Sequence, residues 1–187
     1  MTATLQATET GTSTWRIDPA HSLAEFGVRH LMISTVKGRF TDVQGNLRLA
    51  ADDPTTGQVE VTIGVESIDT GVADRDKHLR SADFFDVERF PSIGFKSRSV
   101  TRVGENELKV TGELTLRDVT REVTLAVEEL GSARDPWGGE RIGFSARVRI
   151  NRKDFGLTWN QVLETGGVVV GEDVKIVLEI QLVRESE

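Results

Sequence analysis

The sequence predicts an all-β fold in which about eight antiparallel strands form a closed barrel or a two-layered sandwich. Apolar and polar residues alternate with period two in short segments, as they do in strands with one buried and one solvated face. Polar turn motifs such as DDPTTG, GEN and ETGG separate these segments, and only one stretch shows clear helical spacing. With so few helices to cover it, an apolar sheet face must close on itself or pack in two layers.

Residues 1–13 are rich in Thr and Ala and lack periodicity, so a disordered tail is expected before a domain at residues 14–187. Strand segments follow along the rest of the chain. They fall at residues 15–17, 24–30, 40–49, 59–65, 93–100, 108–116, 123–127, 144–150 and 176–182. If eight such strands close into a barrel, the interior holds either packed side chains or one small ligand.

The segment at 24–30 carries a histidine on its apolar face. Ala24, Phe26, Val28 and His30 share one parity, which places the imidazole on the side expected to be dry. A buried polar ring needs a hydrogen-bond partner. His30 therefore either bonds a ligand or satisfies a neighbouring turn, strand or helix.

The stretch 69–86 breaks the strand pattern with apolar residues at helical spacing. We expect one helix of about ten residues there, crossing between two strands, because Asp74 can cap its start and Pro91 lies beyond its end. A second, shorter helical turn is expected after Asn151, which can cap it, and Gly156 can end it.

Composition limits the classes of partner and cofactor. The net charge of −7 counts against nucleic acid or an anionic membrane as the main partner, since both need a clustered positive field. The sequence has no cysteine, which excludes disulfides and thiolate metal sites. The sequence contains no run of 18 apolar residues, so no transmembrane helix is predicted. The N-terminus lacks the basic and apolar regions of a secretory signal, so a cytoplasmic location is expected.

No motif predicts catalysis, a metal site or a bound cofactor. The three histidines, His21, His30 and His78, show no HxH or HxxxH spacing, and structural imidazoles are the simpler interpretation. Ser22 follows His21 directly, but adjacent strand residues point to opposite faces and no nucleophile-elbow motif is present. The glycine-rich stretches match no phosphate-binding loop.

Aromatic and basic residues are the remaining candidates for a site. The phenylalanines and Trp159 either fill the barrel as ordinary core or line a cavity, and composition does not separate these alternatives. Basic residues gather near Arg75, Lys77 and Arg80, and again at Arg149, Arg152 and Lys153. A solvated face is the simplest interpretation of both groups.

The N-terminal stretch WRIDPAHSLAEFGVRHLMISTVKGRF contains D-P-x-H-S, F-x-V-x-H, S-x-V and G-x-F in that order, from Asp18 to Phe40. This order of motifs resembles the opening signature of the YceI-like family. RDKHLRSADFFDVERFPSIGFKS, GELTLRDVTREVTL and INRKDFGLTW resemble three further blocks of the family, in the same order. The resemblance extends from about Trp15 to Leu182.

This resemblance implies a lipocalin-like barrel whose hydrophobic tunnel binds a long-chain isoprenoid, a quinone or a fatty amphiphile, without catalysis. The implied ligand-binding lumen residues are Phe26, Val28, His30, Phe40, Phe84, Phe85, Phe90, Phe95, Phe144, Phe155 and Trp159. The candidates for a polar head group are Arg75, Lys77, Arg80 and Lys153. A homodimer is common in the family, and many of its members are exported.

Transport or storage of such a lipid is therefore the expected function, and two alternatives stay open. One is an enzyme that uses the barrel as a dry chamber with histidine acid–base groups, which a histidine and a carboxylate meeting in the lumen would favour. The other is a packed barrel that serves as a stress or interaction module, which the absence of a cavity would favour.

Overall fold

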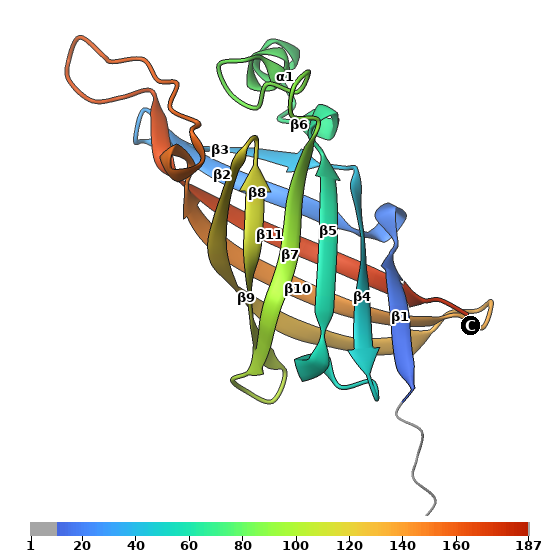
Figure 1. The fold of residues 1–187 in the computed structure, drawn as a ribbon. Helices are drawn as coiled ribbons and strands as arrows, with labels where there is room; N and C mark the ends of the chain where they lie inside the picture. The colour runs from blue at the N-terminus through green and yellow to red at the C-terminus, as the bar shows by residue number, and fades with distance from the viewer. Residues whose placement is uncertain (1–10, 187) are drawn as a thin grey trace, which may run out of the picture.

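Antiparallel strands make up most of residues 11–186, the part of the chain that the computed structural model describes (Figure 1). The strands are β1 (Thr12–Ile17), β2 (Leu23–His30), β3 (Ser34–Phe40), β4 (Val43–Ala50), β5 (Gln58–Gly64), β6 (Ile68–Asp69), β7 (Ser92–Arg102), β8 (Glu107–Leu116), β9 (Val119–Arg134), β10 (Glu140–Asn151) and β11 (Val170–Arg184). The helical segments are α1 (Ala73–Arg80) and the 3-10 turns η1 (Pro19–His21), η2 (Pro54–Thr56), η3 (Val65–Ser67) and η4 (Arg152–Phe155).

Eight of these strands close into an antiparallel barrel. They pair in the order β1, β4, β5, β7, β8, β9, β10 and β11, and β11 pairs back to β1. This closure confirms the predicted eight-stranded barrel with one short helix and excludes the sandwich. The other strands, β2, β3 and β6, extend the wall from β11.

The strand β11 is long enough to pair with two partners along one edge. Its C-terminal part pairs with β1, where Trp15 lies opposite Arg184, and its N-terminal part pairs with β2, where Phe26 lies opposite Ile176. The chain bends between β1 and β2 at η1, whose N-cap is Asp18. The single strand β11 thus pairs with two consecutive N-terminal strands, β1 and β2.

The barrel is narrow at one end and wider at the other. At the narrow end β4 pairs with both β1 and β5. At the wide end β3 pairs with β2 but meets β6 only at Arg39 and Phe40. Within residues 11–186 no ladder joins β3 to β5, and α1 lies over this end of the barrel (Figure 1). We call it the α1 end.

Large side chains fill the narrow end. Trp15 on β1, Leu47 and Leu49 on β4, Leu108 on β8 and Leu182 on β11 are all buried. Their alternation along each strand is the period-two pattern seen in the sequence. This half of the barrel is therefore a packed hydrophobic core.

Two boundaries differ from the sequence-based expectation. β1 begins at Thr12, so the expected tail 1–13 ends too late; Ser13 is buried and accepts a hydrogen bond from Trp15 Nε1. Residues 1–10 of that tail lie outside the described residues. The segment 40–49 is divided between β3 and β4, because the N–H groups of Thr41 and Asp42 leave the sheet and bond Ser67 Oγ.

The helical segments confirm one capping prediction and correct another. Asn151 Oδ1 accepts a hydrogen bond from the Lys153 N–H, and Gly156 ends η4 with φ 76°, as expected. Asp74 does not cap α1, because Val72 occupies the N-cap and Asp74 lies in the first turn. A carboxylate there is still favourable, since it lies near the positive end of the helix dipole.

A cluster of ion pairs joins η1 to the β9–β10 hairpin. Arg141 on β10 contacts Asp18 at 2.6 Å and Asp135 at 2.9 Å. The Arg141 hydrogen bond, followed by one from His21, lowers the pKa of Asp18 to about 2. Because the Asp18 side chain is only 16% exposed, solvent screens this pair less than it screens ion pairs on the open surface.

We expect Asp18→Asn to lower the free energy of unfolding at pH 7 by about 2 kcal/mol. A lowered folded-state pKa stabilises the protein above the ordinary pKa of 3.8, and this stabilisation disappears as the pH falls towards about 2. Urea unfolding at a series of pH values measures it. The control is Glu60→Gln, which removes an exposed pair with Lys96. If the difference in free energy of unfolding between the wild type and Asp18→Asn stayed constant down to pH 2, the stabilising role of the Asp18 carboxylate would be contradicted.

Candidate functional site

A cavity of about 360 Å³ occupies the barrel interior at the α1 end. Its wall consists of alternate residues from the strand halves nearest α1. Typical pairs are Ile93 and Phe95 on β7, and Val148 and Ile150 on β10. The other halves of these strands face the packed core. The barrel is therefore filled at one end and hollow at the other.

Most of the lumen residues expected from the sequence line this cavity. Those that do are Phe26, Val28, His30, Phe40, Phe84, Phe85, Phe95 and Trp159. Three do not. Phe144 faces inward but lies further towards the packed half, and Phe155 is buried in the core at η4. Phe90 lies outside the cavity, under the guanidinium groups of Arg89 and Arg117.

Two of the lining phenylalanines lie against glycines of neighbouring strands. The Phe26 ring covers Gly38 on β3, and the Phe95 ring covers Gly112 on β8, so a Cβ at either glycine would collide with the ring. A ring that rests on a glycine occupies the place of the missing side chain. These rings therefore lie along the wall, and the centre of the barrel stays open.

An aromatic cluster joins α1 to the loop 156–169. The His78 ring meets the Trp159 ring edge-on at 4.7 Å and the Phe84 ring at 5.1 Å, measured between centroids. His78 Nε2 also lies 2.8 Å from Asp83 Oδ2. His78, Phe84 and Trp159 all line the cavity, so this cluster forms its boundary at the α1 end.

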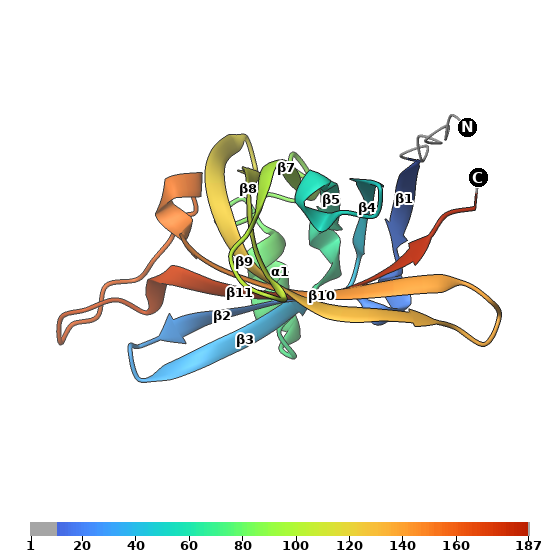
Figure 2. The ribbon, with the colours of Figure 1, turned by 90° about the horizontal axis from the view of Figure 1, so that it is seen from below.

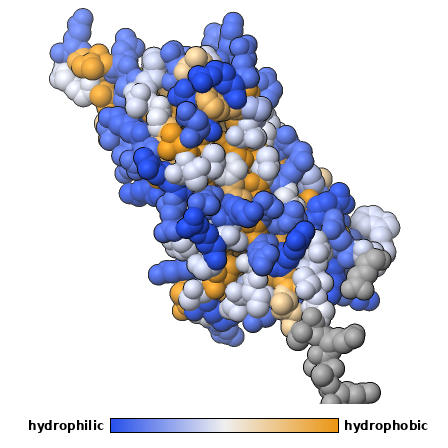
Figure 3. Space-filling model, in the orientation of Figure 1, coloured by the Kyte–Doolittle hydropathy of each residue, from blue (hydrophilic) through white to orange (hydrophobic). Residues whose placement is uncertain are grey.

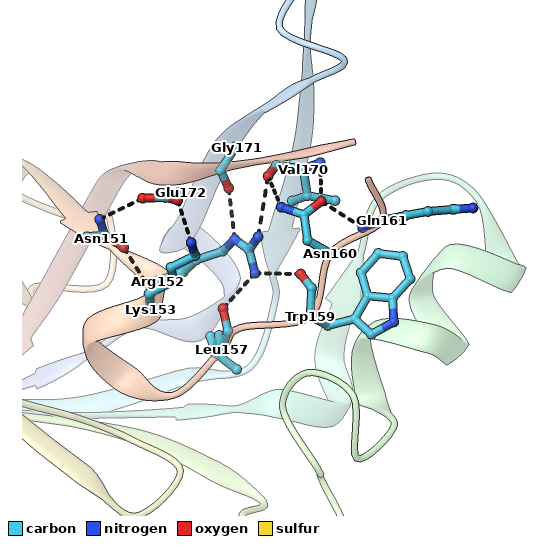
Figure 4. Close-up of polar contacts among 10 residues, drawn as sticks. All are labelled: Asn151, Arg152, Lys153, Leu157, Trp159, Asn160, Gln161, Val170, Gly171 and Glu172. Atoms are coloured by element: carbon cyan, nitrogen blue, oxygen red, sulfur yellow. Dashed lines mark hydrogen bonds and ion pairs between the residues drawn. The ribbon is translucent and has the colours of Figure 1, made fainter. Parts of the chain in front are cut away.

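Arg152 is a site residue that the sequence interpretation assigned to a solvated face. Its side chain is buried and lines the cavity. Its guanidinium donates to the carbonyl oxygens of Leu157, Trp159, Val170 and Gly171 at 2.6 to 3.3 Å (Figure 4). Burial lowers the pKa of Arg152, and the charge of nearby Glu172 opposes that shift.

Two of these bonds hold the loop 156–169, at Leu157 and Trp159, and the other two reach the start of β11, at Val170 and Gly171. The loop lacks regular structure apart from one bridge between Val162 and Val168, so its backbone carbonyls need partners from elsewhere. Arg152 supplies them from η4. The only local sequence signal was its position at the start of a capped turn.

The four head-group candidates do not lie together. Arg75 lines the cavity, where it donates to Thr70 Oγ1 at 2.7 Å and to the Thr70 carbonyl at 2.9 Å. Lys77 is exposed. Arg80 bonds the carbonyl oxygens before α1, and Lys153 pairs with Glu172 outside the cavity. Arg75 alone of these four faces the lumen.

The three histidines occupy separate places. His21 pairs with Asp18 on the outer surface, His78 pairs with Asp83, and His30 lines the cavity on β2. No side-chain hydrogen bond of His30 is found within residues 11–186. In the same range, no group of three or more His, Asp or Glu is arranged to hold a metal ion, and no helix has the length and apolar character needed to cross a bilayer.

The model of the YceI-like domain matches residues 15–182. The chain belongs to the YceI-like family. Protein YceI of Salmonella newport is 39% identical over 166 residues, which cover 89% of this chain and 83% of that protein. Within the YceI-like fold, the four family motifs seen in the sequence form β1 to β3 with the η1 corner, the segment from α1 into β7, the β8–β9 hairpin, and η4 with the residues after it.

Solved structures share this YceI-like barrel. BcnA of Burkholderia cenocepacia matches with a TM-score of 0.77 and 22% identity, over 88% of this chain and 98% of that chain. A domain from Saccharophagus degradans, described as polyisoprenoid-binding, matches with a TM-score of 0.67 and 17% identity, over 91% and 98%. At these identities the likeness shows the fold alone.

We expect Arg152→Met to lower the free energy of unfolding by about 2–4 kcal/mol, because the carbonyl oxygens of Leu157, Trp159 and Gly171 lose their Arg152 donor, while the Val170 carbonyl keeps a bond from Asn160 Nδ2. Amide hydrogen exchange in the loop 156–169 rises as well. Urea unfolding and exchange measurements check both. The control is Arg149→Met, which removes an exposed, 3.8 Å pair with Asp173. Unchanged exchange in that loop would show that Arg152 does not hold it.

Proposed function

We propose that this YceI-like protein binds a long-chain isoprenoid or a similar amphiphile in the cavity, and carries or stores it without changing it chemically. The observation that supports this most directly is the division of the cavity wall. Aliphatic and aromatic side chains make up most of the lining, and the polar residues on it are Glu25, Arg29, His30, Thr70, Arg75, His78 and Arg152. Such a lining suits a hydrocarbon tail with one polar head.

The polar groups lie near one another through a chain of contacts. His30 pairs with Val170 across β2 and β11, and Arg152 donates to the carbonyl of the same Val170. Arg152 also donates to the carbonyl of Trp159, whose ring meets His78. A head group at the α1 end would therefore lie near basic side chains from β2, α1 and η4, of which Arg75, His78 and Arg152 also bond protein groups. A phosphate, a quinone oxygen or a carboxylate is compatible with this set.

The energetics of tail burial support binding without many polar contacts. Removing a CH₂ group from water contributes about 0.8 kcal/mol, so one five-carbon prenyl unit contributes roughly 3–4 kcal/mol before costs. Micromolar affinity needs about 8 kcal/mol beyond the cost of association. A few buried prenyl units supply this. The polyisoprenoid-binding description of the Saccharophagus degradans domain, which shares the fold, also supports this ligand class.

The two alternatives fit the geometry less well. A packed interaction module does not explain a cavity of about 360 Å³, which is many times the roughly 30 Å³ that a water occupies in the liquid. The His78–Asp83 pair favours acid–base chemistry, but the Asp83 side chain is 55% exposed and does not line the cavity. Glu25 is the carboxylate on the described lining, but it is an exposed residue and no hydrogen bond joins it to a histidine within residues 11–186. Thr70 is the only hydroxyl residue on the described lining, and it already bonds Asp76 and Arg75.

Blocking the cavity tests the proposal. We expect Val148→Trp to weaken binding of a fluorescent farnesyl probe by about tenfold or more, because the added ring occupies the space of the tail. Fluorescence titration measures this, with Arg147→Trp as the control on the exposed face of the same strand. Equal probe affinity in both variants and the wild type would contradict a binding role for this cavity.

The head-group position is tested on α1. We expect Arg75→Met to weaken binding of farnesyl pyrophosphate by about tenfold, because a charge-assisted hydrogen bond is worth roughly 1.5–3 kcal/mol. Farnesol, which lacks the charge, binds nearly as before. Lys77→Met on the same helix is the control and changes neither affinity. An equal loss for both ligands would indicate that Arg75 acts only through Thr70.

A further inference from the structure

Two hairpin tips lie side by side beyond the α1 end of the barrel. One is the turn of residues 31–33 between β2 and β3, and the other is the end of the loop 156–169. Both ribbon views show the β2–β3 turn beside the loop, which projects further (Figures 1 and 2). The Leu31 N–H donates to the Val169 carbonyl at 2.9 Å, so backbone bonding ties the turn to the base of the loop, next to β11. We call them the paired tips.

The paired tips expose large apolar side chains to water. Ile33 is 80% exposed, Val162 78% and Met32 56%. The space-filling view shows hydrophobic colour at the end of the loop 156–169 (Figure 3). One exposed apolar residue is ordinary, but three on neighbouring projections form a feature that needs a partner.

The β2–β3 turn holds two bulky apolar residues, Leu31 and Met32, at a conformational cost. Its central residues, Leu31 and Met32, have φ values of 50° and 60°, and the Ile33 N–H bonds the His30 carbonyl at 3.1 Å. Positive φ at both central positions favours Asn and Gly, which tolerate the left-handed region. Bulky apolar residues there are strained, and such strain is found mostly where function retains it. The geometry of the turn therefore gives no reason for a methionine at position 32.

The paired tips continue directly into the cavity wall. His30, which precedes the turn, lines the cavity, and so do Val169 and Val170 at the end of the loop. Trp159, at the start of the same loop, lines it too. The exposed apolar surface and the proposed ligand site are therefore carried by the same two segments of chain.

We propose that the paired tips insert into the surface of a lipid bilayer, so that the α1 end of the cavity faces the membrane when ligand is exchanged. The exchange step rests on the proposed function, because a long hydrocarbon ligand is dissolved in membranes. Insertion itself does not.

The shape of the tips favours a bilayer over a protein partner. Two narrow projections do not offer the roughly 800 Å² per partner that a stable protein interface buries, but they can enter between lipid head groups. The charge around the tips is mixed, because Arg29 and the exposed Lys37 lie on the β2–β3 hairpin and Glu164 is exposed in the loop 156–169. The apolar side chains, and not a positive field, would therefore make the membrane contact.

Vesicle flotation tests the proposal. The probe is a vesicle made of phosphatidylcholine, which has no net charge, because the net charge of −7 counts against an anionic surface. The protein is the full chain. We expect the wild type to float with the vesicles, and the triple variant Met32→Ser, Ile33→Ser, Val162→Ser to bind them at least about tenfold more weakly. Trp137→Ser is the matched control. Trp137 is 87% exposed at the β9–β10 turn, at the opposite end of the molecule (Figure 2).

A second variant separates insertion from folding. Met32→Gly relieves the positive φ and removes an apolar side chain, so we expect equal or higher thermal stability together with weaker vesicle binding. A wild type that does not float overturns the proposal, as does vesicle binding that the triple variant retains or that Trp137→Ser loses equally.

The farnesyl probe in vesicle-free solution distinguishes the two proposals. If wild type and triple variant bind this probe equally while only the wild type floats, the tips act as the membrane contact. If the wild type binds the probe but does not float, the membrane proposal fails and the proposed function stands. A wild type that floats without binding the probe supports insertion and overturns the proposed function.

Discussion

The double pairing of β11 is the constraint on which the rest of the structure depends. A sheet with one apolar face and almost no helix to cover it is stable in water only if its edges meet. β11 brings them together by pairing with β1 near its C-terminus and β2 near its N-terminus. The bend at η1 allows this, because it divides the N-terminal segment into β1 and β2. Each of these strands pairs with β11 along one edge, and along the other edge β1 pairs with β4 and β2 with β3. One end closes tightly against β4 and the other diverges along β3.

This divergence gives the two halves of the barrel different contents. Where β1, β4 and β5 pair in succession, side chains such as Trp15 and Leu47 fill the interior. Where β3 is not joined to β5, non-strand segments complete the wall: α1 and the loop 156–169. Such segments carry backbone groups that need partners. Arg152 bonds two carbonyl oxygens of the loop, those of Leu157 and Trp159, and two at the start of β11, so a buried cation is a structural consequence of a barrel that stays open at one end.

Local patterns were enough to predict the strands and which residues face inward, but not where along the barrel the cavity lies. Val148 and Phe144 have the same parity on β10, yet only Val148 reaches the cavity. Their difference depends on which strand ladders continue to the α1 end, and that is fixed by contacts between residues far apart in sequence. Arg152 was missed for a related reason. A basic residue beside Lys153 is typical of an exposed turn, and only the folding of a distant loop over it makes it buried.

The contact between Phe26 and Gly38 gives the bore an adjustable width. At residue 38 the nearest atoms to an added methyl group are side-chain atoms of Phe26 and Thr70, whereas at Gly112 the nearest is the backbone oxygen of Lys96. Movement of the Phe26 ring can make room for the methyl group at residue 38, but at residue 112 the collision with the Lys96 oxygen would remain unless a strand moved. Gly38→Ala on β3 would therefore narrow the lumen without changing its polar groups. Such a variant separates the selection of a ligand by the width of its tail from selection by its head group.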